Sequence, residues 1–251
     1  IATDSNNNVY VTGHFQGNMT IPTAGGDTTL TTTGTGGNII DDAFIVKYNT
    51  SGTPQWAVSL GGTSDDYGYA IATDSNGNVY VTGIFQGNMT IPTAGGDTTL
   101  TSAGNYDIFV VKYNTSGTPQ WAKKIGGTTA DSGYAIATDS NGNVYVTGYF
   151  SGSVTIPTAG GDTTLTTTGS NDNDILFVKY NTGGTPQWAK SIGGTSADQG
   201  NGITTDSNGN VCVVGTFYGN MTVDGTLLTN LGSADIFIVK YNTSGILQWK
   251  K

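Results

Sequence analysis

The chain has 251 residues, of which 39 are glycine, 35% are hydrophobic and only 11% are charged. This composition is typical of many short strands and turns, and it excludes a helical or disordered protein. Every acidic residue is aspartate and every basic residue is lysine, and the net charge is −9. We therefore expect neither nucleic acid nor an anionic membrane as a partner, because both require basic surfaces. No apolar run is long enough to insert into a bilayer.

A hairpin sequence is written four times along the chain. Residues 71–83 read Ile-Ala-Thr-Asp-Ser-Asn-Gly-Asn-Val-Tyr-Val-Thr-Gly, and the other copies are residues 1–13, 136–148 and 203–215. The Asn76-Gly77 pair tolerates positive φ and is flanked by β-branched and aromatic residues, which predicts a tight hairpin of two strands, a and b. Asn7 replaces the glycine in the first copy, and asparagine also tolerates this conformation.

A second, smaller hairpin follows in each copy. The first three copies read Thr-Ile-Pro-Thr-Ala-Gly-Gly-Asp-Thr-Thr-Leu-Thr, whereas the fourth is shortened around Asp224-Gly225. A two-residue Asp-Gly turn is typical of a tight hairpin. A loop of changing length comes next and is the most variable part of the repeat. Its copies are residues 32–41, 102–106, 167–173 and 230–234.

Two further strands, c and d, complete each copy. Strand c begins at an aspartate and continues through an almost unbroken apolar run, which predicts burial on both faces. Strand d contains a tryptophan, preceded in the first three copies by a proline that suits the start of an edge strand. Such an edge, guarded only by the proline and by lysines such as Lys123 and Lys124, favours self-association.

Each copy therefore supplies four principal strands, with a small hairpin between b and c. Four-stranded sheets repeated around an axis form a β-propeller, in which neighbouring blades bury each other's faces. The sequence predicts an all-β fold, a single β-propeller over residues 1–251. Its four blades are expected at about residues 1–60, 61–125, 126–192 and 193–251.

The repeat resembles a known family. The matching segments are the hairpin sequence above, then Asp-Ile-Phe-Val-Val-Lys-Tyr-Asn, then Gln-Trp-Ala-Lys-Lys-Ile-Gly-Gly followed by Asp131-Ser-Gly-Tyr. They are similar to the SBBP β-propeller repeat of secreted and surface proteins of bacteria and archaea. The resemblance covers essentially the whole chain, and it implies a propeller and an extracellular or cell-surface location. It does not specify a function.

The number of blades in the ring is open at this point. The family is named for seven blades, whereas this chain has four repeats. Four blades either close on themselves or form part of a larger ring completed by more chain or by a second copy. The uniform a-to-d order and the small residues around Ile in strand a favour a self-closed ring. Because the chain starts at Ile1, inside a repeat, we expect a processed or excised piece.

Asp74, Asn76 and Asn78 have the spacing that opens a calcium loop. The later positions do not fit, because Val79 and Phe85 stand where such loops have Gly and Glu. A turn in which Asp and Asn side chains bind nearby backbone groups is the favoured interpretation. Calcium is the alternative, and no other cofactor is expected.

A second aspartate recurs between strands d and a, as Asp66, Asp131 and Asp198. The favoured interpretation is a cap on backbone donors at the corner of the blade. The alternative is a ring of carboxylates around one mouth of the channel, where it would hold a cation or a sugar hydroxyl.

The aromatic, histidine and cysteine residues have similar alternatives. The strand d tryptophans either pack on the neighbouring blade, which we favour, or stack on sugars; they are Trp56, Trp121, Trp188 and Trp249. His14 is the only histidine and has no visible catalytic partner. Cys212 replaces a tyrosine of the other copies and is expected to be a packed side chain.

Six Asn-x-Ser/Thr sequons occur, and we expect all of them to be exposed and open to glycosylation in a secreted protein. They are Asn18, Asn88 and Asn220 before the small hairpin, and Asn49, Asn114 and Asn242 in the turn from c to d. The third repeat is a natural control, because it has Ser153 in place of Asn and Gly183 two residues after Asn181.

These observations favour a non-enzymatic extracellular structural or interaction module, such as a self-assembling component of a surface layer, filament or adhesin. Its expected partners are further copies of itself and a glycan or another surface molecule. A carbohydrate-binding propeller with one site per blade is the alternative. An enzyme comes third, because only the variable loops and residues such as His14, Asp41 and Asp172 remain to supply its groups.

Overall fold

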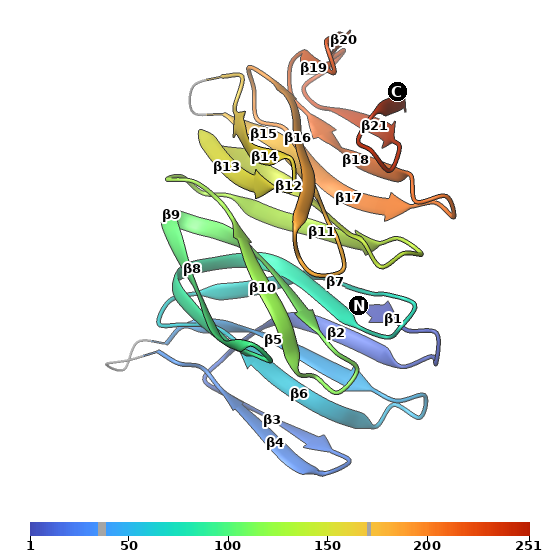
Figure 1. Cartoon of the computed structure of the whole chain (residues 1–251). Coiled ribbons are helices and arrows are strands. Elements are labelled where there is room, and N and C mark those ends of the chain that lie inside the picture. The colour runs from blue at the N-terminus through green and yellow to red at the C-terminus, as the bar shows by residue number, and fades with distance from the viewer. Residues whose placement is uncertain (35–38, 170–171) are drawn as a thin grey trace. The chain divides into compact units, whose positions relative to one another are not determined.

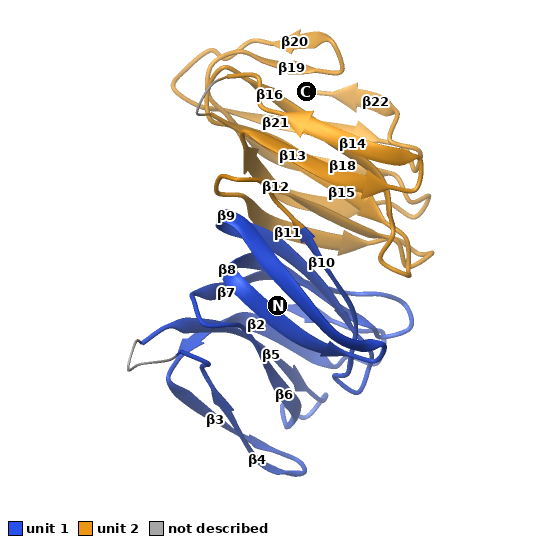
Figure 2. Cartoon of the chain, turned by 60° about the vertical axis from the view of Figure 1, so that its left-hand side comes forward, with its two compact units in different colours: residues 1–124 blue, residues 125–251 orange. Residues whose placement is uncertain are grey.

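The computed structural model describes residues 1–34, 39–169 and 172–251, and within these ranges it contains strands and turns but no helix (Figure 1). Parts of the variable loops at residues 32–41 and 167–173 lie outside the described residues. The chain divides into two compact units, residues 1–124 and 125–251 (Figure 2). Each unit contains two of the four repeats.

The first unit contains two four-stranded antiparallel sheets. The first blade has the order β1-β2-β5-β6, with bounds Ala2–Thr3, Val9–Gln16, Asp41–Tyr48 and Pro54–Leu60. The second blade consists of β7, β8, β9 and β10, with bounds Asp66–Thr73, Val79–Thr93, Gly96–Tyr113 and Pro119–Ile125. These strands are the predicted a, b, c and d in chain order.

The second unit repeats this arrangement. The third blade consists of β11, β12, β15 and β16, with bounds Ser132–Thr138, Val144–Ser151, Asn173–Tyr180 and Pro186–Gly194. The fourth blade consists of β17, β18, β21 and β22, with bounds Gln199–Thr205, Val211–Phe217, Asp235–Tyr241 and Leu247–Lys250. The prediction of an all-β protein of propeller repeats is confirmed. The single propeller over the whole chain and its number of blades stay predictions.

The predicted small hairpin is present between strands b and c of every blade. It is formed by β3 (Asn18–Thr23) with β4 (Gly26–Thr31), by β13 (Ser153–Thr158) with β14 (Gly161–Thr166), and by β19 (Met221–Val223) with β20 (Thr226–Leu228). In the second blade it continues β8 and β9, where Met89 pairs with Leu100. The turn of the a–b hairpin is also as predicted, because Asn7 has φ 60° and Gly77 has φ 76°.

Strand d, the outer strand of each blade, was predicted to be an edge whose unpaired backbone groups are protected only by a proline and lysines. In the structure, part of this edge is hydrogen-bonded. At its start, the tip of the small hairpin donates a hydrogen bond to the proline carbonyl, as Ala94 N does to Pro119 O at 2.9 Å. At its end, β16 pairs with β19 of the next blade through Gly193 and Gly194. The small hairpins therefore use part of this edge, which the sequence alone did not indicate because both contacts are distant in the chain.

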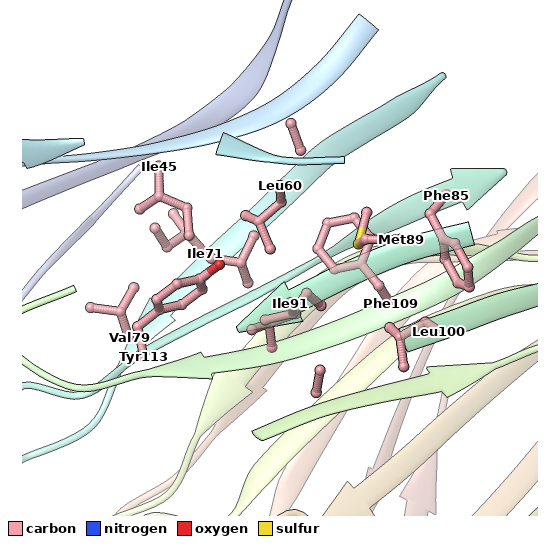
Figure 3. Packing of buried hydrophobic residues seen from close by; sticks show 14 of the residues in the cluster. Ile45, Leu60, Ile71, Val79, Phe85, Met89, Ile91, Leu100, Phe109 and Tyr113 are labelled. Atoms are coloured by element: carbon pink, nitrogen blue, oxygen red, sulfur yellow. The ribbon is translucent and has the colours of Figure 1, made fainter. Parts of the chain in front are cut away.

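Each unit has a hydrophobic core between its two blades. In the first unit, Ile45 and Leu60 of the first blade contact Phe109 and Tyr113 of the second, together with Met89 of the small hairpin (Figure 3). In the second unit the corresponding cluster joins β15 and β16 to β18, β19 and β21. Burial of one such side chain stabilises the folded state by roughly 1.5–3 kcal/mol, so the blade faces hold each unit together.

Candidate functional site

The carboxylate of Asp74 accepts four hydrogen bonds within its own hairpin. Oδ1 accepts from the backbone N–H of Asn76 and of Asn78, both at 2.9 Å. Oδ2 accepts from Asn78 Nδ2 at 2.8 Å and from Tyr80 Oη at 2.9 Å. These contacts are those of the predicted Asx-type turn. Calcium binding at Asp74, Asn76 and Asn78 stays a prediction.

The fourth repeat holds its turn aspartate differently. Cys212 stands where the other repeats have the tyrosine that donates to the aspartate, and Lys240 Nζ lies 2.8 Å from Asp206 Oδ2 instead. The hydrogen bond from Lys240, followed by those from Asn210 and Asn208, holds the pKa of Asp206 well below its usual value. A lysine thus replaces a tyrosine as the donor to the same carboxylate.

The recurrent aspartates between strands d and a are fully buried and are held by two backbone donors each. Asp66 accepts from Gly62 N at 2.7 Å and from Gln86 N at 3.2 Å. Asp131 accepts from Gly127 N at 2.8 Å and from Ser151 N at 3.0 Å, and Asp198 accepts from Gly194 N at 2.8 Å and from Tyr218 N at 2.9 Å. These are the contacts of a corner cap. The alternative, a ring around a channel mouth, stays a prediction.

A second set of buried carboxylates was not singled out from the sequence. Asp42, Asp107 and Asp174 begin strand c and are at most 2% exposed. Oδ1 of each has no hydrogen-bond partner in the described residues. Oδ2 of each accepts a backbone N–H from the preceding loop at 3.0–3.1 Å. The signal available in the sequence was an aspartate at the same place in every repeat, directly before a buried strand.

The two sets of aspartates lie close enough to influence each other within a unit. Burial, which disfavours the charged form, raises the pKa of Asp66 to about 8, and the charge of Asp42 adds to the effect. Burial raises the pKa of Asp42 to about 6. In the second unit burial raises the pKa of Asp198 to about 6, with the charge of Asp174 adding to it. Burial at these corners therefore shifts the carboxyl groups toward their protonated form.

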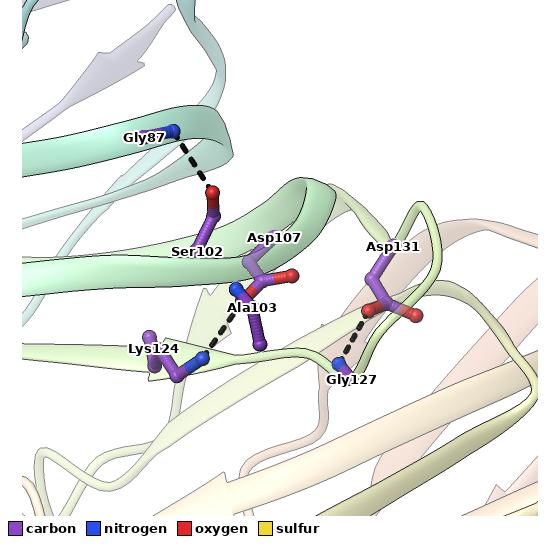
Figure 4. A network of polar contacts seen from close by, with 7 residues as sticks. All are labelled: Gly87, Ser102, Ala103, Asp107, Lys124, Gly127 and Asp131. Carbon is purple, nitrogen blue, oxygen red and sulfur yellow. Dashed lines mark hydrogen bonds and ion pairs between the residues drawn. The ribbon is translucent and has the colours of Figure 1, made fainter.

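The second blade has a lysine at its corner (Figure 4). Lys124 Nζ lies 2.8 Å from Asp107 Oδ2, which also accepts from Ala103 N at 3.0 Å.

In the first and third blades, a glycine lies against the carboxyl group of the strand c aspartate. Gly61 contacts Asp42 and Gly193 contacts Asp174, so closely that any side chain at either glycine would collide with the carboxyl group. Within the described residues, no three acidic, histidine or cysteine side chains form a group suited to a metal ion.

Trp56 and Trp188 pack on the neighbouring blade of their own unit, as the sequence favoured, whereas Trp249 is 41% exposed. Trp56 Nε1 and Lys47 Nζ both donate to the carbonyl oxygen of Thr115, at 3.1 and 3.2 Å. The Trp56 ring lies against Gly117, where an added Cβ would come within 2.8 Å of it. In the second unit Trp188 and Lys179 donate in the same way to Thr243 O, at 3.1 and 2.9 Å, and the Trp188 ring lies against Gly245.

The six sequons fall into two groups. Asn18, Asn88 and Asn220 are exposed, as predicted. The turn asparagines Asn49, Asn114 and Asn242 are only half-buried rather than exposed, because each Oδ1 accepts two backbone N–H bonds inside its own turn. Glycosylation of all six stays a prediction.

Two of the remaining candidates, His14 and Asp41, lie on either side of Tyr67 in the first unit. The ring of His14 lies 4.8 Å from that of Tyr67, edge to face, and the rings of Tyr69 and Tyr106 each lie 6.3 Å from Tyr67. Tyr67 Oη donates to Asp41 Oδ2 at 3.3 Å. Burial raises the pKa of Tyr67 to about 12, and the charges of Asp65 and Asp41 add to the effect. Asp172 belongs to the other unit.

Comparison with known proteins finds the same kind of repeat in a protein family and similarity to two longer proteins. A family model described as a β-propeller repeat, SBBP, matches residues 55–83, 120–149 and 187–224. An uncharacterized WD repeat-containing protein of Acanthamoeba polyphaga mimivirus is 31% identical over 304 residues, which covers 99% of this chain and 22% of that protein. The regulatory protein FlaEY of Caulobacter vibrioides is 32% identical over 146 residues, 55% of this chain and 15% of that protein.

The chain therefore spans less than a quarter of the length of these relatives. The described part of the chain has no helix whose length and apolar character would let it span a membrane.

Proposed function

We propose that this chain, three segments of which match the SBBP β-propeller repeat, is a non-enzymatic structural or interaction module that associates with further copies of itself at a cell surface or outside the cell. One observation carries this proposal. The recurrent polar side chains hold turns and corners, and they do so in the same way at the hairpin turns of the first three repeats and at the three corners between strands d and a.

Such repetition favours a structural role over a catalytic one. The turn aspartates Asp4, Asp74 and Asp139 each bind a tyrosine of the same hairpin, and the corner aspartates each bind two backbone donors. A catalytic site usually requires one carboxylate whose environment differs from that of the others. The resemblance to repeats of secreted and surface proteins supports the proposed location.

Negative-stain imaging and sedimentation over a range of concentrations test the proposal. We expect rings, stacks or filaments of more than one chain, growing with concentration. Isolated single chains at high concentration would overturn self-assembly.

Mass spectrometry of the native protein tests the location. Glycans are expected on peptides from the first, second and fourth repeats and not at Ser153 or Asn181, which lack the sequon. Three of the predicted sites, Asn18, Asn88 and Asn220, are exposed and are expected to carry the most glycan. Unmodified peptides throughout would remove this support for a surface glycoprotein.

The aromatic group in the first unit favours carbohydrate binding as a second candidate. His14, Tyr67, Tyr69 and Tyr106 lie together beside Asp41, and aromatic faces next to acidic acceptors are suited to sugar rings and hydroxyls. In the second unit the positions equivalent to His14, Tyr67, Tyr69 and Tyr106 hold Tyr149, Gln199, Asn201 and Ala234, so only one of the four is aromatic. The second candidate is therefore one site in the first unit rather than one site per blade.

Thermal unfolding in the presence of a broad glycan panel tests this candidate, because a ligand that binds the folded state raises the melting temperature. Tyr69→Ala should remove any shift, since Tyr69 is 43% exposed at the edge of the aromatic group. Tyr218→Ala, at a tyrosine that is 44% exposed in the other unit, is the matched control and should leave the shift unchanged. No shift with any glycan would count against the candidate.

A further inference from the structure

We propose that the outer face of the fourth blade binds the outer face of the first blade of a second copy of this chain. The inference rests on the proposed function and names the surfaces that would join the copies. The C-terminal face is defined by Cys212, Val214, Ile236, Ile238 and Trp249. The N-terminal face is defined by Val9, Val11, Phe44 and Tyr48, together with Thr50 and Gly52 of the turn from β5 to β6.

The C-terminal face is exposed although its counterpart in the same unit is buried. Ile236 is 77% exposed and Ile238 is 37% exposed. The residues in the same register of the third blade, Ile175 and Phe177, are fully buried. Val214 is 38% exposed, whereas its counterpart Thr147 is fully buried. A contiguous apolar surface of this kind marks an interaction site.

The structure shows what covers the same face elsewhere. In the second unit the fourth blade covers the third through Val211, Val213, Phe237, Val239 and Tyr241. In the first unit the second blade covers the first through Val79, Val81, Phe109, Val111 and Tyr113. The first blade carries the same residue types in the same register, as Val9, Val11, Phe44, Val46 and Tyr48. Four of these are only half-buried, and Val46 lies under the small hairpin.

The polar contacts between blades have their counterparts on these two faces. In both units a tryptophan donates to a threonine carbonyl in the next c–d turn, and its ring lies against the glycine of that turn. Trp249, which is 41% exposed, is the equivalent donor on the C-terminal face. Thr50 and Gly52 are the equivalent acceptor and contact on the N-terminal face, and the space beside Gly52 is open. Donor and acceptor are therefore present at opposite ends of one chain.

Three differences between the C-terminal face and the corresponding face of the third blade are compatible with this docking. Cys212 is smaller than the tyrosine it replaces, and it lines a depression of about 280 Å³ with Ile203, Val214 and Ile238. Tyr241 contacts Phe177 in the second unit, with ring centroids 4.9 Å apart. Tyr48 is the counterpart of Tyr241 in the first blade, and Ile238 is the counterpart of Phe177 in the fourth. In the proposed contact, Tyr48 of a second copy would therefore lie against Ile238, at the edge of the depression. Lys240 is held by Asp206, so Trp249 is the donor that remains for Thr50.

Because the two faces differ, the contact is head to tail. Such a contact produces a ring of several copies if the rotation between copies closes, and a filament if it does not.

The test uses one blocked variant for each face. Ile238→Asp places a charge on the C-terminal face, and Val9→Asp places one on the N-terminal face. Leu231→Asp, at a residue that is 90% exposed and belongs to neither face, is the matched control. Sedimentation of the wild type and of Leu231→Asp should show assemblies larger than one chain. Each blocked variant should self-associate at least tenfold more weakly than the wild type. Each should therefore sediment as a single chain. Circular dichroism checks that the chain is folded.

Mixing the two blocked variants gives the sharpest outcome. Each retains the face that the other lacks, so the mixture should form a one-to-one dimer and nothing larger. A mixture that stays monomeric would overturn the inference.

Two further results would overturn it. If the wild type assembles and both blocked variants still assemble, another surface joins the copies, and the inference fails while the proposed self-association stands. If the wild type is a single chain, self-association fails as well. Maleimide labelling then identifies the occupant, because a Cys212 that reacts only in Ile238→Asp indicates that the face is covered within the same chain.

Discussion

The corners of the first two blades hold the same buried carboxylate by different means. Asp42 and Asp107 are both fully buried, both have an unpartnered Oδ1, and both accept a loop N–H at Oδ2. Lys124 adds a cation in the second blade, whereas Ser59 stands at the equivalent place in the first. A buried carboxyl group without a cation favours its protonated form, which is why the pKa of Asp42 is raised to about 6. The second blade thus places a cation beside this carboxyl group, whereas the first blade leaves it without one.

The largest effect is expected from removing the cation. Lys124→Met leaves the Asp107 carboxylate buried beside an apolar side chain, and the free energy of unfolding at pH 7 should fall by about 2 kcal/mol. The loss should lie below the range for a fully buried pair, because Lys124 is 34% exposed. Urea unfolding measures it. Ser59→Met, the same change in the blade without an ion pair, is the control and should cost much less; equal losses would mean that the ion pair contributes nothing.

The pH dependence of stability should separate the two corners. The pKa values of Asp42 and Asp66 are raised to about 6 and about 8. The folded state therefore keeps protons that the unfolded chain has released, and the stability these groups contribute is fully present below pH 4 and is lost as pH rises to 8. Asp42→Asn removes one of these groups, so its stability relative to wild type should increase by about 1–2 kcal/mol between pH 4 and pH 7.

Urea unfolding at the two pH values measures this difference. Asp107→Asn is the comparison, because it removes an ion pair and should lower stability at pH 7. Parallel pH profiles for wild type and Asp42→Asn would show that Asp42 does not take up a proton on folding.

Placing a lysine beside Asp42, as Lys124 lies beside Asp107, should make the two corners alike. Ser59→Lys gives the first blade the residue that the second blade has, three positions after the strand d tryptophan. A cation near Asp42 Oδ2 should raise the free energy of unfolding at pH 7 by about 1 kcal/mol. It should also lower the pKa of Asp42 toward its usual value. Thermal unfolding at pH 7 and pH 5 checks both effects; a gain of equal size at the two pH values would point to a general surface effect of the lysine.

The smallest effect concerns the third blade. Thr168 Oγ1 donates to Asp174 Oδ2 at 3.0 Å, at a position where the second blade has Ala103. Thr168→Ala should therefore lower the free energy of unfolding by about 0.5–1 kcal/mol. Thr164→Ala, in the exposed small hairpin, is the control for loss of a threonine hydroxyl, since its partner Thr155 is also exposed. An unchanged midpoint for Thr168→Ala would mean that the backbone donor alone satisfies Asp174.

Local chemistry allowed the sequence to predict the elements. The Asn-Gly turn, the Pro before the tryptophan and the repeated apolar runs specify strands a to d and the small hairpin, because turn residues and alternation act over a few neighbours. The packing of Trp56 and Trp188 on the next blade was also predictable, since residues at the same place in two copies have equivalent neighbours. The turn geometry of Asp74 belongs to this class, because all its donors lie within six residues.

Contacts between distant segments were decided only by the tertiary structure. Burial raises the pKa of Asp42, with the charges of Asp41 and Asp65 adding to the effect, and the charge of Asp42 in turn raises the pKa of Asp66. No local pattern brings Asp42 and Asp66 together. The exposure of Ile236 was likewise not visible in the sequence, because its local sequence is that of a buried strand and yet the side chain is 77% exposed. The sequence by itself determined the blades and their turns through short-range geometry and hydrophobic pattern, whereas burial, pKa and free faces depend on which segments meet across the fold.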